Sequence, residues 1–382
     1  MNIRKNKPYF KILAIIFIIF LNTFFILGIV QKDAVFSENE NRVLSKVPKL
    51  TFDNISSGRF SKKFEKYCAD QFPNRELFIK LKTKTDIIFG KKEENNVFIG
   101  SDGYLIEKFQ NPDNEAIYQK LLAINKFTQK YSNINHYFII VPNASDIISD
   151  KLPKNAPTIV QRPFIERFFD NLDSKINKIN LYDEFYSYNE HPIFYRTDHH
   201  WTSDGAYQAF LKLASSMNLN VNSDYYDRHL VSDSFFGTLA SKVGFYDKSG
   251  DEIYVYLPKN KSEDTVVSYV EEKTKSPSIY DTTKLESKNK YELFLKGNHP
   301  LVKIKTSTRN TKTILIIKDS YANCFIPFLT PFFSNIIVVD PRYYFEDLYE
   351  LIEMENVTDI LYLYNANTFF DDTFLADVLN NK

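Results

Sequence analysis

The stretch TILIIKDS, residues 313–320, decides the fold of the chain. Its apolar part has the length of a buried β-strand, and a predicted helix at 321–329 follows at once. Two further apolar runs, NIIVV at 335–339 and DILYLY at 359–364, flank another predicted helix at 344–354. Short apolar strands that alternate with helices indicate a parallel sheet with helices on both faces. We therefore expect an α/β fold.

The alternation of strands and helices extends toward the N-terminus. The run HYFIIV at 136–141 predicts another buried strand, and a weaker strand is predicted at 179–182. A hairpin with an Asp-Gly turn is predicted at 96–106. Between about 220 and 307 the pattern changes to alternating Tyr-rich strands, which indicates a β-rich insertion. Helical periodicity is found at 57–72, 75–89, 114–130, 163–175 and 202–217.

The N-terminus combines a basic tail with the most apolar stretch of the chain. All four charged residues in the first eleven are basic, and residues 12–30 contain no charge. At 1.5 Å per residue, a helix of this length approaches the ~30 Å thickness of the hydrocarbon core. No convincing A-x-A cleavage site follows, so the sequence favours an uncleaved anchor over a signal peptide. The positive-inside rule then predicts a cytoplasmic tail at 1–11, a transmembrane anchor at 12–30, a juxtamembrane helical segment at 31–95 and an extracytoplasmic sheet domain at 96–382.

Composition excludes some classes of function. Among 382 residues, 48 Lys and Arg balance 48 Asp and Glu, and 43% are hydrophobic. This argues against a disordered chain and against a nucleic-acid binder that works by bulk positive charge. Without its basic tail, the chain has a formal net charge near −4. Cys68 and Cys324 are too few for a disulfide framework or a Cys-rich zinc site, and a single bridge or two free thiols both fit the sequence.

The densest cluster of reactive side chains is Asp198-His199-His200, beside the single tryptophan, Trp201. Asp198 and His200 are two residues apart, so in an extended chain both project to one side. A carboxylate beside an imidazole holds the correct tautomer and stabilises the protonated ring. The cluster also suits a zinc or manganese site, but no further ligand lies at helical spacing nearby and no H-E-x-x-H is present.

A second candidate is Ser320, which follows the strand 313–317 and opens a helix. α/β hydrolases place their nucleophile at such a strand-to-helix turn. Ser320 is therefore expected at the carboxyl edge of the sheet, where its own backbone N–H can help to bind an oxyanion. The strong form of the motif, G-x-S-x-G, is absent, and a simple capped helix is the alternative.

Arg196-Thr197-Asp198-His199-His200-Trp201 resembles the signature of the bacterial DHHW family, which is similar to the SGNH-hydrolase-like proteins that O-acetylate alginate. The resemblance covers about residues 37–364. Other blocks resemble the family in the same order: SENENR at 37–42, DQFPNR at 70–75, VFIGSDGYL at 97–105, FLKGNHP at 294–300, KDSYA at 318–322 and DPRYY at 340–344.

The resemblance implies an SGNH-hydrolase-like (flavodoxin-like) parallel sheet and a Ser-His-Asp triad. In this chain Asp198 would orient the base, His200 would be the general base and Ser320 the nucleophile, with His199 as the alternative base. Lys318 stands where a G-D-S block has glycine, which puts the glycine-dependent turn in question. Groups expected to bind the oxyanion or the substrate are Arg342, Tyr364, Asn365, Gly297, Asn298, Trp201 and Arg196.

Together with the apolar N-terminal stretch, the resemblance implies a membrane-anchored, extracytoplasmic O-acetyltransferase or acetylesterase that acts on a cell-surface polysaccharide. The nucleophile would take an acetyl group and pass it to a sugar hydroxyl or to water. We expect no cofactor, no bound metal and no nucleic-acid partner. By resemblance to the alginate system, a multipass membrane O-acyltransferase would supply the acetyl group. The alternatives are a catalytically inactive SGNH-like protein that binds glycan or organises an envelope polysaccharide machine, and a metal-dependent hydrolase that uses the Asp-His-His cluster.

Overall fold

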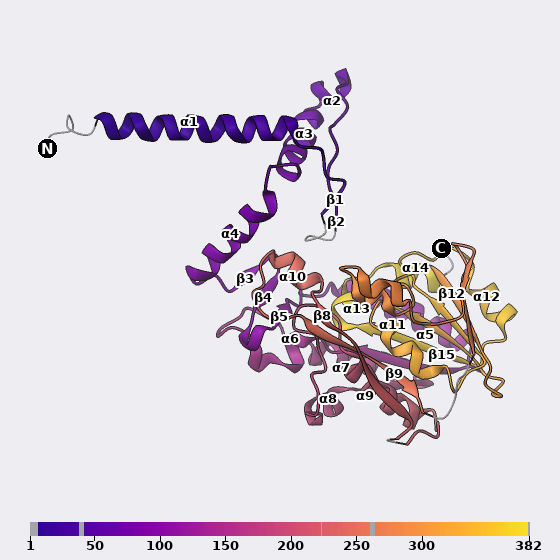
Figure 1. Cartoon of the computed structure of the whole chain (residues 1–382). Helices are drawn as coiled ribbons and strands as arrows, with labels where there is room; N and C mark the ends of the chain where they lie inside the picture. Colours follow the sequence, from indigo (N-terminus) through magenta and orange to yellow (C-terminus); the bar gives the residue numbers. More distant parts are fainter. Residues whose placement is uncertain (1–6, 38–41, 223, 260–263, 381–382) are drawn as a thin grey trace. The chain divides into compact units, whose positions relative to one another are not determined.

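The structure is a computed structural model that describes residues 7–37, 42–222, 224–259 and 264–380 (Figure 1). Residues 1–6 of the predicted basic tail and 38–41 of the SENENR block lie outside the described residues. The chain forms two compact units, Met1–Lys91 with Ser241–Tyr246, and Lys92–Ala240 with Asp247–Lys382. The domain boundaries expected from the sequence stay predictions.

The first unit contains a long apolar helix, α1 (Lys7–Val30), whose residues from Pro8 onward are long and apolar enough to cross a membrane. Arg42, which is partly exposed, and the buried Asp70 form an ion pair of 2.6 Å, which joins two of the family-like blocks. The Arg42 guanidinium holds the pKa of Asp70 well below its usual range. The other elements are β1 (Phe36–Ser37), β2 (Arg42–Val43), α2 (Phe52–Ser56), α3 (Arg59–Asp70) and α4 (Arg75–Ile88).

The second unit is built on an eight-stranded sheet in the order β11-β10-β12-β14-β13-β15-β6-β7. The strands from β14 to β7 are parallel, and β12, β10 and β11 extend the sheet in antiparallel fashion. Their bounds are β6 (Asn135–Val141), β7 (Ile176–Ile179), β10 (Thr265–Tyr269), β11 (Thr274–Ser276), β12 (Leu301–Thr306), β13 (Thr313–Lys318), β14 (Asn335–Val339) and β15 (Asp359–Asn365).

Helices cover both faces of this sheet. Every residue of β13 is buried, although successive side chains point to opposite faces. The helices of the second unit are α5 (Asn114–Lys130), α6 (Ala144–Ile147), α7 (Arg162–Asn171), α8 (Tyr182–Ser187), α9 (Ser203–Ser216), α11 (Ala322–Phe325), α12 (Leu348–Glu355), α13 (Ala366–Asp371) and α14 (Phe374–Asn380). A further helix, α10 (Thr238–Val243), has residues in both units. The predicted α/β architecture is therefore confirmed.

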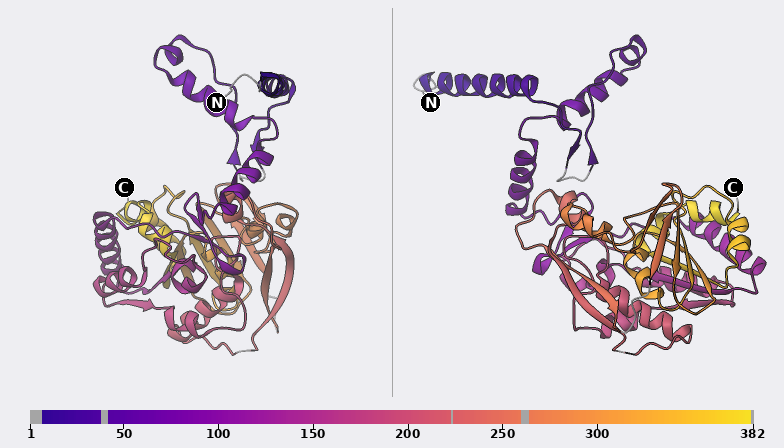
Figure 2. Two further views of the ribbon diagram at one scale, coloured as in Figure 1. Left: turned by 90° about the vertical axis from the view of Figure 1, so that its left-hand side faces the viewer. Right: turned by 45° about the vertical axis from the view of Figure 1, so that its right-hand side comes forward.

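The β-rich insertion divides into two parts. Its first part, β8 (Tyr226–Phe235) and β9 (Asp251–Pro258), pairs as a separate two-stranded sheet, which Figure 2 shows as one long twisted ribbon. Its second part, β10 to β12, is not an appendage, because it joins the main sheet through β14. Three of the eight strands of the main sheet thus come from the region read as an insertion.

Three predicted boundaries are wrong. The helix expected at 163–175 is α7, which ends four residues earlier, at Asn171. The strand expected at 179–182 is β7, three residues earlier, because Tyr182 already begins α8. The helix expected from residue 344 begins at Leu348, because the Asp347 side chain accepts hydrogen bonds from the first backbone N–H groups of α12. The predicted hairpin is present as β4 (Val97–Ile99) and β5 (Leu105–Glu107), preceded by β3 (Glu93–Glu94).

Candidate active site

Ser320 lies in the turn between β13 and α11, and Asp319 shapes that turn. One Asp319 carboxylate oxygen accepts a hydrogen bond of 2.8 Å from the backbone N–H of Tyr321. The other accepts from the backbone and side-chain N–H groups of Asn365, at 2.9 and 2.6 Å. Residues 318–320 are not among the positive-φ positions, so the turn does not require a glycine. The doubt that the missing glycine raised about this turn is therefore removed.

Lys318, which stands in place of that glycine, is buried beneath the serine turn. Its ammonium group donates to the side-chain oxygens of Asn298 and Asn323, both at 2.9 Å, and lies 3.4 Å from Asp340. Burial lowers the pKa of Lys318, while the Asp340 carboxylate acts in the opposite direction. The lysine thus ties the strand that carries Ser320 to the Gly297-Asn298 loop.

The Asp-His-His cluster lies in the loop before α9, and this loop is held from two sides. Asp251, at the start of β9, accepts hydrogen bonds from the backbone N–H groups of Arg196 and Thr197, at 3.0 and 2.8 Å. On the other side, the fully buried Trp201 donates its indole N–H to the carbonyl of Tyr321 at 2.9 Å. The loop and the serine turn are therefore connected by a hydrogen bond between residues far apart in the sequence.

Asp198, His200 and Ser320 form a continuous chain of hydrogen bonds. His200 Nδ1 is 2.5 Å from Asp198 Oδ1, and His200 Nε2 is 2.8 Å from Ser320 Oγ. Since Asp198 is an acceptor, Nδ1 carries the proton and Nε2 is free to accept one from the serine. The second Asp198 oxygen accepts from the backbone N–H and the hydroxyl of Thr238, at 2.7 and 3.1 Å. The structure therefore brings together the three residues expected to form a triad.

Burial and neighbouring charges set the protonation of this chain. Burial raises the pKa of Asp198, but His199 and His200 more than offset it, so that the pKa lies well below its usual range. Burial, together with His199, lowers the pKa of His200 to about 4, against the opposing effect of Asp198. At neutral pH Asp198 is thus ionised and His200 is neutral, the state in which Nε2 accepts a proton.

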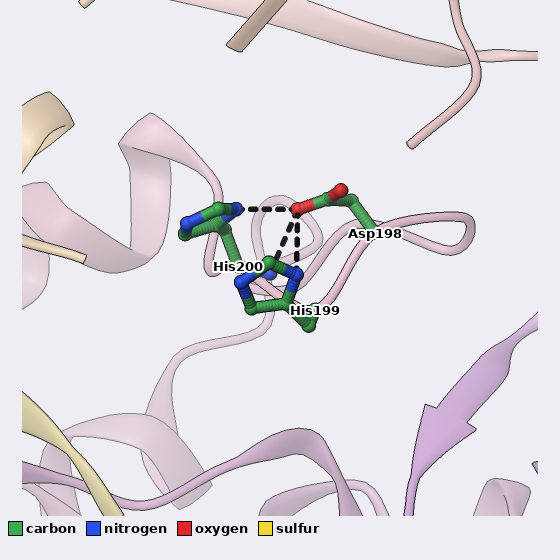
Figure 3. Close-up of side chains that lie close together, drawn as sticks. All are labelled: Asp198, His199 and His200. Atoms are coloured by element: carbon green, nitrogen blue, oxygen red, sulfur yellow. Dashed lines mark hydrogen bonds and ion pairs between the residues drawn. The ribbon is translucent and has the colours of Figure 1, made fainter. Parts of the chain in front are cut away.

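His199 faces a different neighbour. Its Nδ1 is hydrogen-bonded to the Thr238 hydroxyl at 2.7 Å and lies 3.6 Å from Asp198 Oδ1. Figure 3 shows that this single Asp198 oxygen is joined by dashed lines to both imidazole rings. It is His200 that contacts Ser320, which makes His200 the better placed of the two candidate bases.

The same cluster meets a geometric requirement for a metal site. One ligand atom each from Asp198, His199 and His200 lies within 4.8 Å of the other two. However, both Asp198 oxygens already accept protein hydrogen bonds, and His199 Nδ1 is bonded to Thr238. A metal ion would have to replace these hydrogen bonds, so the cluster fits a hydrogen-bonded site better than a metal centre.

Two tyrosines that the sequence did not single out support the site. The ring of Tyr291 stacks on His200, with ring centroids 3.8 Å apart and planes at 13°. Its hydroxyl lies 3.2 Å from both the Ser320 carbonyl and Cys324 Sγ. The Tyr321 hydroxyl donates to the carbonyl of His199 and accepts from the Asn143 side chain at 3.0 Å. Together they fix the imidazole plane and the serine turn.

Asn143 is a third residue missing from the prediction. It follows β6, and its side chain donates to the side-chain oxygen of Asn365, at the end of β15, at 3.1 Å. Its own oxygen accepts from the backbone N–H of Asn367 at 2.9 Å. Because β6, β13 and β15 are parallel, the rule that selected Asn365 applied equally to Asn143.

The remaining predicted residues lie near the site, but most are engaged in other contacts. Arg342 forms two hydrogen bonds with Asp340, at 2.8 and 2.6 Å. Arg196 binds Asp251 at 3.1 Å. Tyr364 and Trp201 are buried in the core, so neither presents its ring at the surface. Gly297 and Asn298 are held by the Asn323 side chain, at 3.2 Å each. Among the described residues both cysteines are free, with Cys68 exposed and Cys324 buried.

Comparison with known proteins agrees with this architecture. A family model described as DHHW protein matches residues 96–339. A DHHW family protein from Eubacterium siraeum DSM 15702 is similar in structure, with a TM-score of 0.64 and 22% identity, over 76% of this chain and 96% of that one. Bacillus cereus PatB1, solved with a sulfonyl adduct, has a TM-score of 0.62 and 21% identity, over 73% and 97%. These two likenesses show the fold.

A weaker likeness is to the O-acetyltransferase domain of Pseudomonas putida AlgJ, with a TM-score of 0.46 and 12% identity, over 75% of this chain and 100% of that one. No curated protein matches the chain.

Proposed function

Because the chain belongs to the DHHW protein family, we propose that it is a membrane-anchored, extracytoplasmic O-acetyltransferase or acetylesterase that acts on a cell-surface polysaccharide. Ser320 is the proposed nucleophile, His200 the general base and Asp198 the residue that orients the base. The observation that carries this proposal is the 2.8 Å contact between His200 Nε2 and Ser320 Oγ, because a general base must reach the proton that it removes. This contact also favours catalysis over an inactive glycan-binding scaffold.

The proposed reaction has two steps. In the first, Ser320 Oγ attacks the carbonyl carbon of the acetyl donor, and its proton passes to His200 Nε2. The bond to the leaving group then breaks, and the leaving group takes that proton. In the second step a sugar hydroxyl, or water in the esterase case, attacks the acetyl-serine and gives its proton to His200. The bond between Oγ and the acetyl carbon breaks, and Oγ recovers the proton.

The surroundings of His200 suit this role. Asp198 holds the proton on Nδ1 and stabilises the imidazolium that forms during each step. The stacked Tyr291 ring keeps the imidazole in the plane that points Nε2 at the serine. The backbone N–H of Ser320 is the proposed first donor to the oxyanion, with Gly297, Asn298, Asn365 and Arg342 as candidates for the oxyanion or substrate contacts.

The proposed setting is the outer surface of the membrane. The helix α1 is long and apolar enough to act as the anchor, with the basic tail in the cytoplasm. An acetyl group that originates in the cytoplasm must cross the membrane to reach such an enzyme. We therefore propose a multipass membrane O-acyltransferase as the partner that delivers it. A single anchor of this kind would keep the enzyme close to that partner.

Covalent labelling tests the nucleophile directly. PatB1 has been solved with a sulfonyl adduct, so an arylsulfonyl fluoride is the chosen probe, applied to the full chain in detergent. We expect one adduct, located by peptide mass at Ser320, and loss of aryl acetate hydrolysis in parallel. The variants Ser320→Ala and His200→Ala should each abolish hydrolysis, whereas Ser249→Ala, at an exposed serine, should leave it unchanged.

The controls separate the alternatives. Unchanged hydrolysis in Ser320→Ala or His200→Ala would refute the triad. A folded wild-type chain that neither reacts with the probe nor hydrolyses the ester, but binds glycan, would support the scaffold. Inhibition by a chelator together with stoichiometric metal in the purified protein would support the Asp-His-His metal centre instead.

A further inference from the structure

The helix α4 carries apolar side chains on its outer face, away from the rest of its unit. Leu77, Leu81 and Ile88 are 63%, 58% and 73% exposed, and their spacing places all three on one side of the helix. Phe89, at the end of the helix, is 85% exposed. Meanwhile Thr83, on the opposite side, is buried. A stripe of this kind usually faces another apolar phase.

Lysines lie along one edge of this stripe. At 100° per residue, Lys80 and Lys84 follow that edge, whereas Lys82 lies on another face and pairs with Asp86 at 2.9 Å. The helices α3 and α4 together carry eight Lys and Arg against four Asp and Glu, whereas the whole chain is balanced. An apolar face flanked by basic side chains is typical of a helix that lies in the membrane interface.

The N-terminal end of α4 contacts the helix proposed to span the membrane. The ring of Phe24 in α1 is stacked on Phe72, with centroids 5.4 Å apart, and meets Phe78 edge-on at 5.5 Å. Phe24 lies six residues before Val30, which ends α1, or about 9 Å along the helix axis. Interfacial helices bury their apolar face about 5–10 Å into the headgroup and acyl boundary. Phe72 and Phe78 are therefore at the depth of that boundary.

A cavity of about 450 Å³ adjoins this aromatic contact. Phe72, Leu77 and Lys80 line it together with residues of the segment that follows α1. The cavity thus places apolar side chains at the end of the proposed membrane helix, while its charged lining is balanced, with Arg75 and Lys80 against Asp70 and Glu76.

We infer that α4 lies in the extracytoplasmic membrane interface as a second membrane contact, with Leu77, Leu81 and Ile88 among the lipid chains and with Lys80 and Lys84 against anionic phospholipid. The inference rests on the proposed spanning role of α1. Charge selects the lipid class, because basic side chains are attracted to an anionic membrane surface. The contact with α1 favours the bilayer over a second protein, because it holds α4 at the bilayer surface.

The test measures the depth of α4 in a bilayer with the full chain. The exposed Cys68 is first replaced by serine. An environment-sensitive fluorophore is then attached to the cysteine of the Leu81→Cys variant, which lies on the stripe. The matched control is the Glu76→Cys variant, labelled in the same way on another face of the helix. The protein is reconstituted in phosphatidylcholine vesicles with or without phosphatidylglycerol. Nitroxides attached to the lipid chains should quench the label at position 81 several-fold more than at 76. Quenching should increase with phosphatidylglycerol and decrease in Lys80→Glu/Lys84→Glu.

Three results would overturn the inference. Equal quenching at both positions in both lipids would show that the stripe does not enter the bilayer. If the label at position 81 is protected from quenching, and this protection rises only with the protein-to-lipid ratio, a second copy of the chain covers the stripe. Carbonate extraction distinguishes failure of the α1 anchor from failure of the α4 position. If carbonate releases the chain from the membrane, the spanning role of α1 is refuted. If the chain is retained but the label at position 81 is not quenched, only the interfacial position of α4 is refuted.

Discussion

One carboxylate oxygen of Asp198 accepts two hydrogen bonds from His200, one from the ring at 2.5 Å and one from the backbone N–H at 3.0 Å. An amide in its place would present N–H to His200 Nδ1 and so favour the tautomer with its proton on Nε2. That tautomer cannot accept the serine proton. We expect Asp198→Asn to lower kcat for an aryl acetate by about 10³- to 10⁴-fold. Thermal unfolding of the variant controls for stability, and a loss below tenfold would contradict the orienting role.

The low pKa of His200 has a measurable consequence. Activity requires the neutral imidazole, so it should be retained as the pH falls and be lost only near pH 4, where the ring becomes protonated. An unperturbed histidine would lose activity near pH 6.5. The measurement is kcat/KM against pH, with circular dichroism at each pH to confirm that the fold persists. A loss of activity near pH 6.5 would contradict the expectation that burial lowers the pKa of His200.

The His199→Gln variant provides a second check on the same group. His199 lowers the pKa of His200, whereas Asp198 and, more weakly, Glu107 raise it. Removing the His199 ring should therefore move the acid limb to higher pH and leave kcat at neutral pH within a few-fold of wild type. If instead His199→Gln abolished activity and His200→Gln did not, the assignment of the base would be reversed.

At the scale of elements, the junction of β13 and α11 depends on a buried lysine rather than on a glycine. Lys318 is hydrogen-bonded to Asn298 and Asn323 and paired with Asp340. Replacing it with methionine leaves two amide oxygens and a buried carboxylate without that donor, although Arg342 still binds Asp340. We expect Lys318→Met to lower the free energy of unfolding by about 3 kcal/mol, measured by urea denaturation.

A matched lysine controls for the loss of charge. Lys303 in β12 pairs with Glu355 at 2.7 Å, and both side chains are partly exposed. Because exposed pairs contribute little, Lys303→Met should cost no more than about 1 kcal/mol. If both substitutions lowered the free energy of unfolding equally, burial would not be the reason for the stabilising effect of Lys318.

The sequence predicted those elements whose signal is local. β6, β13, β14 and β15 are unbroken apolar runs, and each is found within a residue or two of its predicted position. β7 was misplaced because its segment, Ile-Asn-Lys-Ile, offers only two apolar residues. The role of β10 to β12 could not be predicted because pairing with β14 depends on a distant strand.

The same distinction holds for the site. Asp198 and His200 are neighbours in the sequence, and Ser320 follows a clear strand, so their proximity was predictable, while their catalytic roles stay predictions. Tyr291 lies in a short 3-10 turn, Lys290–Leu293, with no motif of its own, and only the folded chain stacks it on His200. Asn143 differs, since its place after β6 was a usable signal.

At the scale of the whole molecule, the balance of 48 basic and 48 acidic residues conceals three regions of different charge. The basic tail precedes the apolar helix, α3 and α4 carry an excess of Lys and Arg, and the rest of the chain is correspondingly acidic. The positive charge is thus concentrated around the proposed membrane span. An acidic sheet domain has no bulk attraction for anionic polymers, so recognition of a polysaccharide would depend on local groups.

This distribution leads to a prediction about the fate of α1. An uncleaved anchor should leave the chain in the membrane fraction after carbonate extraction at its full mass of 44.8 kDa. A cleaved signal peptide would instead give a product shorter by about 30 residues, released from the membrane. Intact-mass measurement of the purified protein distinguishes the two. Orientation is tested by replacing the four basic residues of the tail with glutamine. If these residues hold the N-terminus in the cytoplasm, as proposed, a fraction of the chains should then insert the opposite way, and protease protection of the sheet domain in sealed cells should increase.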